Sequence, residues 1–186
     1  MNDIKFTKPR GIIDWLRLFA LYRTAFPRSE RKPFSIIRKT MKEGKGDVWC
    51  VERGGRFAGL AFTINSEHLV LLDYFAVSKK HRGEGIGTAV LVQLMEHYGD
   101  RGFFLEIEST LTDAPDLKAR QKRKHFYLAA GLKPLNVEAI LFDVRMELLG
   151  IRCSLDFDGY QAFYREQYSI WAAKHIEPVE DSGCTM

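Results

Sequence analysis

The residues best suited to chemistry in this sequence form a glycine-rich run, Arg82-Gly-Glu-Gly-Ile-Gly-Thr88, which follows the mostly apolar segment Leu71 to Val77. Glycines at positions 83, 85 and 87 allow positive φ angles and leave the backbone N–H groups unobstructed by side chains. A helix that begins directly after this run adds partial positive charge at its N-terminus. Backbone N–H groups at such a place bind anions, and a pyrophosphate suits this arrangement.

Two common phosphate-binding motifs do not fit the run. No Gly-Lys-Ser/Thr follows at the Walker spacing. The dinucleotide pattern Gly-x-Gly-x-x-Gly fails because its last position holds Thr88 when counted from Gly83 and Val90 when counted from Gly85. The run does match Arg-x-x-Gly-x-Gly, as Arg82, Gly85 and Gly87.

This pattern resembles the acetyl-CoA signature of the GCN5-related N-acetyltransferase (GNAT) family, which follows a strand and opens a helix. The apolar triplet Phe75-Ala76-Val77 precedes it, and Phe126-Tyr-Leu-Ala-Ala-Gly-Leu132 looks like the family's Phe-Tyr-x-x-x-Gly-Phe. The resemblance extends over most of the chain, from Ile12 to Leu149. It implies a mixed α/β (α+β) acyl-CoA N-acyltransferase fold, in which a central, mostly antiparallel sheet is flanked by helices.

The resemblance also implies a function: acetyl-CoA is the cosubstrate, and its acetyl group moves directly to a primary amine. The phosphate contacts fall on the turn made of Arg82, Gly83, Glu84, Gly85, Ile86, Gly87 and Thr88. The strand residues Phe75, Ala76 and Val77 line the pantetheine arm, with the Phe75 N–H on the acetyl carbonyl. Tyr127 protonates the departing thiolate, since a fixed proton donor lowers the barrier to thiolate loss.

A base or a water relay must take a proton from the acceptor amine before it attacks. The candidates are Asp73, Glu106 and Glu108. Glu106 and Glu108 project from one face of a predicted strand, ~6.5–7 Å apart, and either line the cleft or face solvent. The catalytic base that other family members carry on this strand aligns here with Leu71, whose side chain cannot accept a proton. Asp73, two residues further along, is the substitute candidate.

A basic segment precedes Phe126. In the family an Asn and an Ala often stand where this chain has Arg120 and Arg123. With their neighbours they form a basic face that either reaches the ribose phosphate of the cosubstrate, with Arg123 as the contact, or faces water. Nucleic-acid binding is a weaker interpretation, because aromatic residues are not interleaved and the net charge is only +4.

The sequence does not identify the acceptor. A small-molecule amine and a peptide amine agree with it equally well. By resemblance, the loop Pro27 to Lys32 borders the acceptor site, which allows acidic or polar acceptors; otherwise it is a solvated turn. A second hypothesis is a non-catalytic acyl-CoA-binding sensor or regulatory domain, prompted by the uncertain base.

The remaining sequence must supply the elements that hold these residues. In the first predicted helix, Ile12, Leu16 and Phe19 share a face with Phe26, and Tyr22 lies beside them. The periodicity predicts helices over 12–26, 33–42, 86–98, 117–130 and 160–175, and strands over 48–52, 56–64, 68–77 and 103–108, with two more strands filling 133–149.

The chain has 186 residues, of which 46% are hydrophobic and 28% charged, as in ordinary globular proteins. We expect a GNAT domain over 1–150 and an extension over 151–186, with an aromatic helix that packs on the domain or on a second subunit of a homodimer. A polar, mobile tail follows from Glu177.

The three cysteines, Cys50, Cys153 and Cys184, lack a Cys-x-x-Cys pair, and the histidines lack ligand spacing, so we expect neither disulfides nor a metal. We find neither a signal-peptide core nor an apolar stretch of the ~18 residues that a membrane span needs. These features lead us to expect a cytoplasmic protein with no membrane partner.

Overall fold

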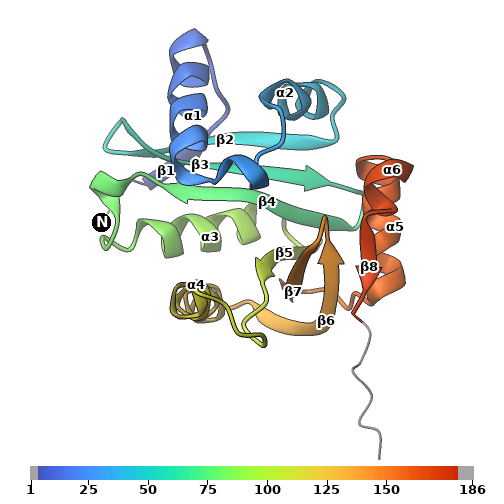
Figure 1. Ribbon diagram of the computed structural model, residues 1–186. Coiled ribbons are helices and arrows are strands. Elements are labelled where there is room, and N and C mark those ends of the chain that lie inside the picture. The colour runs from blue at the N-terminus through green and yellow to red at the C-terminus, as the bar shows by residue number, and fades with distance from the viewer. Residues whose placement is uncertain (1–3, 180–186) are drawn as a thin grey trace, which may run out of the picture. The chain divides into compact units, whose positions relative to one another are not determined.

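The computed structural model describes residues 4–179 and divides after Arg101 into two compact units. Cys184 and the end of the predicted mobile tail lie outside the described residues. Each unit is an antiparallel sheet with helices packed on it (Figure 1). The predicted mixed α/β class, with mostly antiparallel strands flanked by helices, is confirmed.

The first unit contains a four-stranded antiparallel meander in which each strand pairs with the next. Short connections, such as the turn at Gly54-Gly55, allow this pairing between strands that follow each other in the chain. Its strands are β1 (Ile4–Thr7), β2 (Gly46–Arg53), β3 (Arg56–Asn65) and β4 (Leu69–Val77). Strand β1 was not predicted, because four residues carry too little pattern to be recognised.

Helices cover both faces of this meander. Helices α1 (Ile12–Ala25) and α2 (Phe34–Lys42) lie on one face, and α3 (Ile86–His97) lies on the other (Figure 1). Two 3-10 turns, η1 (Arg28–Glu30) and η2 (Lys79–His81), precede α2 and α3. The core under α1 and α2 is formed by buried side chains of the two helices and the sheet: Leu18, Tyr22, Ile37, Val48, Cys50, Leu60, Phe62, Tyr74 and Ala76.

Helix α1 buries a different face from the one suggested by Ile12, Leu16 and Phe19. Ile12 is 73% exposed and Leu16 is 59% exposed, whereas Leu18 and Tyr22 are buried. Apolar residues occur almost all round this helix, so periodicity alone does not select one face. The sheet selects it, because Tyr22 packs against Phe62 and Tyr74 at centroid distances of 5.7 and 4.9 Å.

The second unit has its own antiparallel strands, paired in the order β5, β7, β6, β8. Its helix α4 links β5 to β6. The β6–β7 hairpin turns at Phe142 and Asp143, and both residues have positive φ angles. The elements are β5 (Gly102–Glu108), α4 (Leu117–Ala129), β6 (Lys133–Leu141) and β7 (Val144–Ile151), followed by α5 (Phe157–Gln167), α6 (Ile170–Ala173) and β8 (Ile176–Pro178).

The C-terminal segment differs from the sequence prediction in two ways. The single helix predicted over 160–175 is divided into α5 and α6, because the Ser169 side chain accepts a hydrogen bond from the Ala172 N–H and caps a new helix. The start of the predicted tail forms β8, which pairs with β6. No helix in the described part of the chain is both long and apolar enough to cross a bilayer.

Candidate active site

Strand β4 changes register at Asp73. Tyr74 pairs with Phe62 and Leu72 pairs with Thr63, which leaves Asp73 as the additional residue of a β-bulge. A bulge bends a strand and redirects the side chain of the additional residue. Asp73 therefore leaves the regular alternation of the strand two residues before Phe75, the first of the predicted contacts of the pantetheine arm, Phe75, Ala76 and Val77.

Two of the three glycines of the turn take the positive φ angles that the sequence allows, whereas Gly87 lies within helix α3 and has no positive φ. Gly83 and Gly85 have φ angles of +79° and +74°, a region that residues with a Cβ rarely adopt. A Cβ built on either residue meets no heavy atom within 4 Å, so space lies open in front of the turn. Helix α3 begins at Ile86, with Gly85 as its left-handed N-cap.

The backbone N–H groups of this turn lack partners. Ala89 is the first residue of α3 whose N–H bonds back to the chain, at 3.1 Å from the Gly85 carbonyl oxygen. Among residues 4–179, no hydrogen bond is donated by the six N–H groups from Gly83 to Thr88. The first N–H groups of a helix have no partner within the helix, and they carry its partial positive charge. The turn is thus an exposed row of donors suited to an anion.

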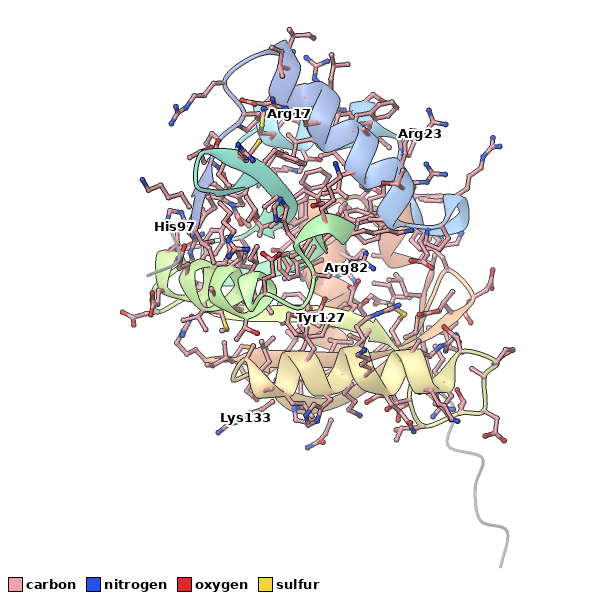
Figure 2. All side chains as sticks on the ribbon, turned by 90° about the vertical axis from the view of Figure 1, so that its left-hand side faces the viewer. Arg17, Arg23, Arg82, His97, Tyr127 and Lys133 are labelled. Carbon is pink, nitrogen blue, oxygen red and sulfur yellow. The ribbon has the colours of Figure 1, made fainter. Side chains whose placement is uncertain are left out.

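Four side chains, Arg82, Glu84, Arg53 and His81, make polar contacts at the turn. The Arg82 Nε donates to the Val77 carbonyl oxygen at 3.3 Å, which ties the turn to the end of β4 (Figure 2). Glu84 forms an ion pair with Arg53, and its carboxylate lies 3.8 Å from the His81 Nδ1. Pairing with Arg53 offsets the negative charge that Glu84 would otherwise add beside an anion-binding turn.

The connection between α1 and α2 is attached to β4 by a network of hydrogen bonds. The Lys32 N–H donates to the Tyr74 Oη at 3.1 Å, and that hydroxyl donates to the Glu30 carbonyl oxygen at 2.7 Å. The Tyr22 Oη donates to the Lys32 carbonyl oxygen at 3.1 Å. Lys32 Nζ also lies 2.7 Å from Asp73 Oδ1, and the Asp73 side chain is only 8% exposed. Asp73 is therefore a partnered carboxylate.

In the second unit, Tyr127 lies in the last turns of α4, where it is half-buried (Figure 2). Burial raises the pKa of Tyr127 to about 12, although the nearby Arg123 lowers it. Within the described residues, its hydroxyl makes no hydrogen bond. A phenol with this pKa keeps its proton at neutral pH, so Tyr127 is available as a proton donor.

The two carboxylates of β5 have different surroundings. Glu106 Oε1 accepts hydrogen bonds from the hydroxyls of Tyr160 and Tyr164, each at 2.7 Å. Both tyrosines come from α5, so the C-terminal segment packs on β5. Glu108 forms ion pairs with the guanidinium groups of Arg120 at 3.1 Å and Arg123 at 3.0 Å.

Ion pairs with carboxylates occupy part of the basic face that the sequence predicts for α4. Arg120 also pairs with Asp116 at 2.8 Å, and Lys124 pairs with Glu147, so carboxylates hold three of the helix's cations. The proposed contact of Arg123 with the cosubstrate stays a prediction, since its guanidinium is bonded to Glu108. Glu147 is buried, which by itself raises its pKa, but hydrogen bonds from Lys124 and Thr110 outweigh burial and lower that pKa.

The first unit brings together most of the predicted residues, because β4, the turn and the start of α3 are continuous in the chain. Tyr127, Glu106 and Glu108 all lie in the second unit. Sequence reasoning missed the groups that hold the candidates in place: Lys32 and Tyr74 beside Asp73, Arg53 beside Glu84, and Tyr160 and Tyr164 on Glu106. Side-chain pairs so far apart in the sequence leave no local pattern.

The geometry fits a phosphate-bearing cosubstrate. Unpaired backbone donors, two glycines with positive φ and open space in front of them are what a pyrophosphate requires. Among the residues described, no group of three His, Cys, Asp or Glu side chains is placed to hold a metal ion.

The sequence profile described as the acetyltransferase (GNAT) family matches residues 15–128. This range includes the glycine-rich turn, the candidate carboxylates and Tyr127. No protein with a curated description matches the sequence.

Solved structures show the same fold at low identity. A protein described as a GNAT-family acetyltransferase, from Bacteroides thetaiotaomicron, is 17% identical, with a TM-score of 0.75 over 91% of this chain and 98% of its own. An aminoglycoside 6'-N-acetyltransferase complexed with coenzyme A is 16% identical, with a TM-score of 0.63 over 80% and 95% of the two chains.

The ribosomal-protein-S18-alanine N-acetyltransferase from Escherichia coli is 15% identical. Its TM-score is 0.58, and the match covers 81% of this chain and 93% of that chain. The aminoglycoside and ribosomal-protein enzymes have chemically different acceptors, so the shared fold leaves the acceptor open.

Proposed function

Because the chain belongs to the acetyltransferase (GNAT) family, we propose that it transfers an acetyl group from acetyl-CoA directly to a primary amine. The observation that carries this proposal is the row of unpaired N–H groups from Gly83 to Thr88, with open space before Gly83 and Gly85. These groups bind the pyrophosphate. Arg82 and the start of α3 add positive charge beside it.

The reaction needs hydrogen-bond or proton donors at the two atoms on which negative charge develops, the carbonyl oxygen and the sulfur. Acetyl-CoA supplies a thioester; the amine nitrogen bonds to its carbonyl carbon, and the carbon–sulfur bond breaks with its electron pair on sulfur. The Phe75 N–H donates to the carbonyl oxygen, on which negative charge develops. Tyr127 gives its proton to the thiolate, and burial keeps that proton in place until then.

The amine must lose a proton as it attacks. Asp73 is the candidate base that we favour, because it lies two residues from Phe75 on the same strand. Its ion pair with Lys32 holds the carboxylate in place. We infer that the proton passes to Asp73 through water.

The test of this proposal is Gly85→Asp. The substitution places a carboxylate in the row of donors and forces a side chain onto a residue with φ of +74°. We expect calorimetry to show that coenzyme A binding falls at least about 100-fold, since like charges then face each other in a confined site.

The matched control is Gly99→Asp. Gly99 has φ of +62°, and an added Cβ there also meets nothing within 4 Å, but it lies after the C-terminal end of α3. This variant carries comparable backbone strain and the same charge change, so its coenzyme A affinity should match that of the wild type. An unchanged titration for Gly85→Asp would remove the basis of the proposal.

The second candidate function is an acyl-CoA sensor without efficient chemistry. One observation favours the sensor. Each of the three candidate bases, Asp73, Glu106 and Glu108, already has a charged or hydroxyl partner in the structure. A thiol-release assay with a broad amine panel separates the two. Tight coenzyme A binding with no release for any amine supports the sensor, and amine-dependent release supports the transferase.

A further inference from the structure

A pocket of about 490 Å³ opens in the first unit between the end of α1 and the start of α2. We call it the α1–α2 pocket and define it by four cationic side chains, Arg23, Arg28, Arg31 and Lys32, and by the rings of Phe19 and Phe34. Its lining contains no carboxylate. Of its lining, the mechanism proposed above uses only Lys32, through the ion pair with Asp73.

The positive charge of this pocket is poorly balanced. Lys32 pairs with Asp73, but Arg23, Arg28 and Arg31 form no ion pair with any carboxylate of residues 4–179. Arg23 lies near the C-terminal end of α1, with its guanidinium 5.6 Å from the Phe19 ring centroid (Figure 2). Three guanidinium groups around one cavity repel one another, and an anion bound between them would relieve that repulsion.

Arg31 combines a position in the pocket lining with a buried donor atom. Its Nε is buried and has no hydrogen-bond partner among the described residues. A buried donor without a partner is costly and uncommon in folded proteins, so Arg31 gains from any acceptor that its guanidinium reaches after a change of side-chain conformation. Guanidinium groups bind carboxylates and phosphates through paired N–H donors.

The aromatic side chains give the pocket an apolar wall. The rings of Phe19 and Phe34 lie 5.1 Å apart between centroids, and Tyr22 lies 5.8 Å from Phe34. Such rings favour contact with an aromatic or apolar group over a fully hydrated ligand. A ligand that satisfies the whole pocket therefore has an anionic end and an apolar body.

The pocket is attached to the strand that carries the proposed reaction. Lys32, which lines the pocket, bonds through its N–H to Tyr74 and through its Nζ to Asp73. Asp73 and Phe75 are two residues apart on β4, ~6.5–7 Å by the rise of a strand. A small ligand in this pocket thus lies on the side of β4 where the candidate base is held.

We propose that the α1–α2 pocket selects the acceptor: a primary amine that also carries a carboxylate or a phosphate and an aromatic or apolar body. This inference rests on the proposed function and specifies its substrate class. Arg28 and Arg31 bind the anionic group, Phe19 and Phe34 contact the body, and the amine extends towards Asp73. Polycationic amines are disfavoured, because the unpaired guanidinium groups repel them.

The first experiment compares acceptors on the full chain with acetyl-CoA in a thiol-release assay. Phenylalanine carries both recognition features, phenylalaninamide lacks the carboxylate, and phosphoethanolamine carries a phosphate without a ring. We expect kcat/KM to be at least about tenfold higher for phenylalanine than for its amide, although the amide's amine is the more readily deprotonated. Faster turnover of phosphoethanolamine than of phenylalaninamide identifies the anion as the dominant feature.

The second experiment changes the pocket. Arg31→Gln and Arg28→Gln should each raise KM for phenylalanine about tenfold and leave KM for acetyl-CoA unchanged. Arg56→Gln is the matched control, since Arg56 is exposed at the start of β3 and the substitution removes the same charge. The inference is overturned if Arg31→Gln and Arg56→Gln have equal KM for phenylalanine, or if the amide is the better acceptor.

A third measurement separates this inference from the transferase proposal. N-acetylphenylalanine has the anion and the ring but no reactive amine, so its calorimetric titration does not depend on turnover. Binding that is lost in Arg31→Gln and retained in Arg56→Gln supports the pocket even if no amine releases thiol. Equal binding, or none to the wild type, counts against the pocket even if other amines are acetylated.

Discussion

At the scale of single residues, the candidate site depends on how burial and pairing set the charge of each group. Burial holds the proton on Tyr127, and an ion pair with Lys32 occupies Asp73. Tyr127 therefore has a proton to give, and the Asp73 carboxylate is held by a cationic partner. Glu108 has less freedom, because two arginines hold it.

The substitution Tyr127→Phe tests the proton donor. We expect kcat to fall about 100-fold, the usual lower range for loss of a general acid, while the affinity for coenzyme A stays within about twofold. The measurements are a thiol-release assay and calorimetry. Because its pKa is about 12, Tyr127 should not limit wild-type kcat below about pH 11. An unchanged kcat in the variant would assign the proton to water or to another group.

At the scale of elements, helix α1 contributes to both the core and the proposed acceptor pocket. Leu18 and Tyr22 pack into the core, while Phe19 and Arg23 line the α1–α2 pocket. One helix can do both because side chains one position apart point about 100° apart around the axis. The exposed residues Ile12 and Leu16 lie on neither of these surfaces.

The substitution Leu18→Ala tests which face of α1 is buried. Leu18 is 0% exposed, so the loss of its side chain should lower the free energy of unfolding by about 2–5 kcal/mol. Leu16→Ala removes the same atoms from a residue that is 59% exposed and should change stability by less than about 0.5 kcal/mol. Urea denaturation measures both. Similar losses for the two variants would contradict the assigned orientation.

At the scale of the whole molecule, several phenols are buried with their protons. Burial raises the pKa of Tyr22 to about 12 and raises the pKa of Tyr74 and of Tyr98 as well. In an unfolded chain these groups ionise near pH ~10. Their contribution to stability is therefore complete below pH ~10 and is lost as the pH rises towards the folded pKa values.

We accordingly expect the free energy of unfolding to be flat with respect to these groups from pH 8 to 9 and to fall above pH ~10. Each buried phenol steepens that fall by up to ~1.4 kcal/mol per pH unit, because the folded state holds one proton more than the unfolded state. Denaturation curves at successive pH values provide the measurement. Tyr98→Phe should give a shallower slope; an identical slope would show that Tyr98 titrates normally in the folded protein.

Much of the fold and part of the site could be predicted from the sequence. The helices over 86–97 and 117–129 agree with prediction to within a residue at each end. The glycine-rich turn was predictable because a positive φ, a helix start and unobstructed N–H groups are local properties of glycine at positions 83 and 85. Such features depend on residues that are neighbours in the chain.

Other features were decided by the tertiary structure alone. The buried face of α1 depends on which side meets Phe62 and Tyr74. The partner of Asp73 comes from 41 residues earlier, and the hydroxyls on Glu106 come from 54 and 58 residues later. Local sequence determines backbone conformation, whereas charge balance and burial depend on residues brought together by folding. For that reason the sequence indicated the glycine-rich turn, and the structure was needed to find the α1–α2 pocket.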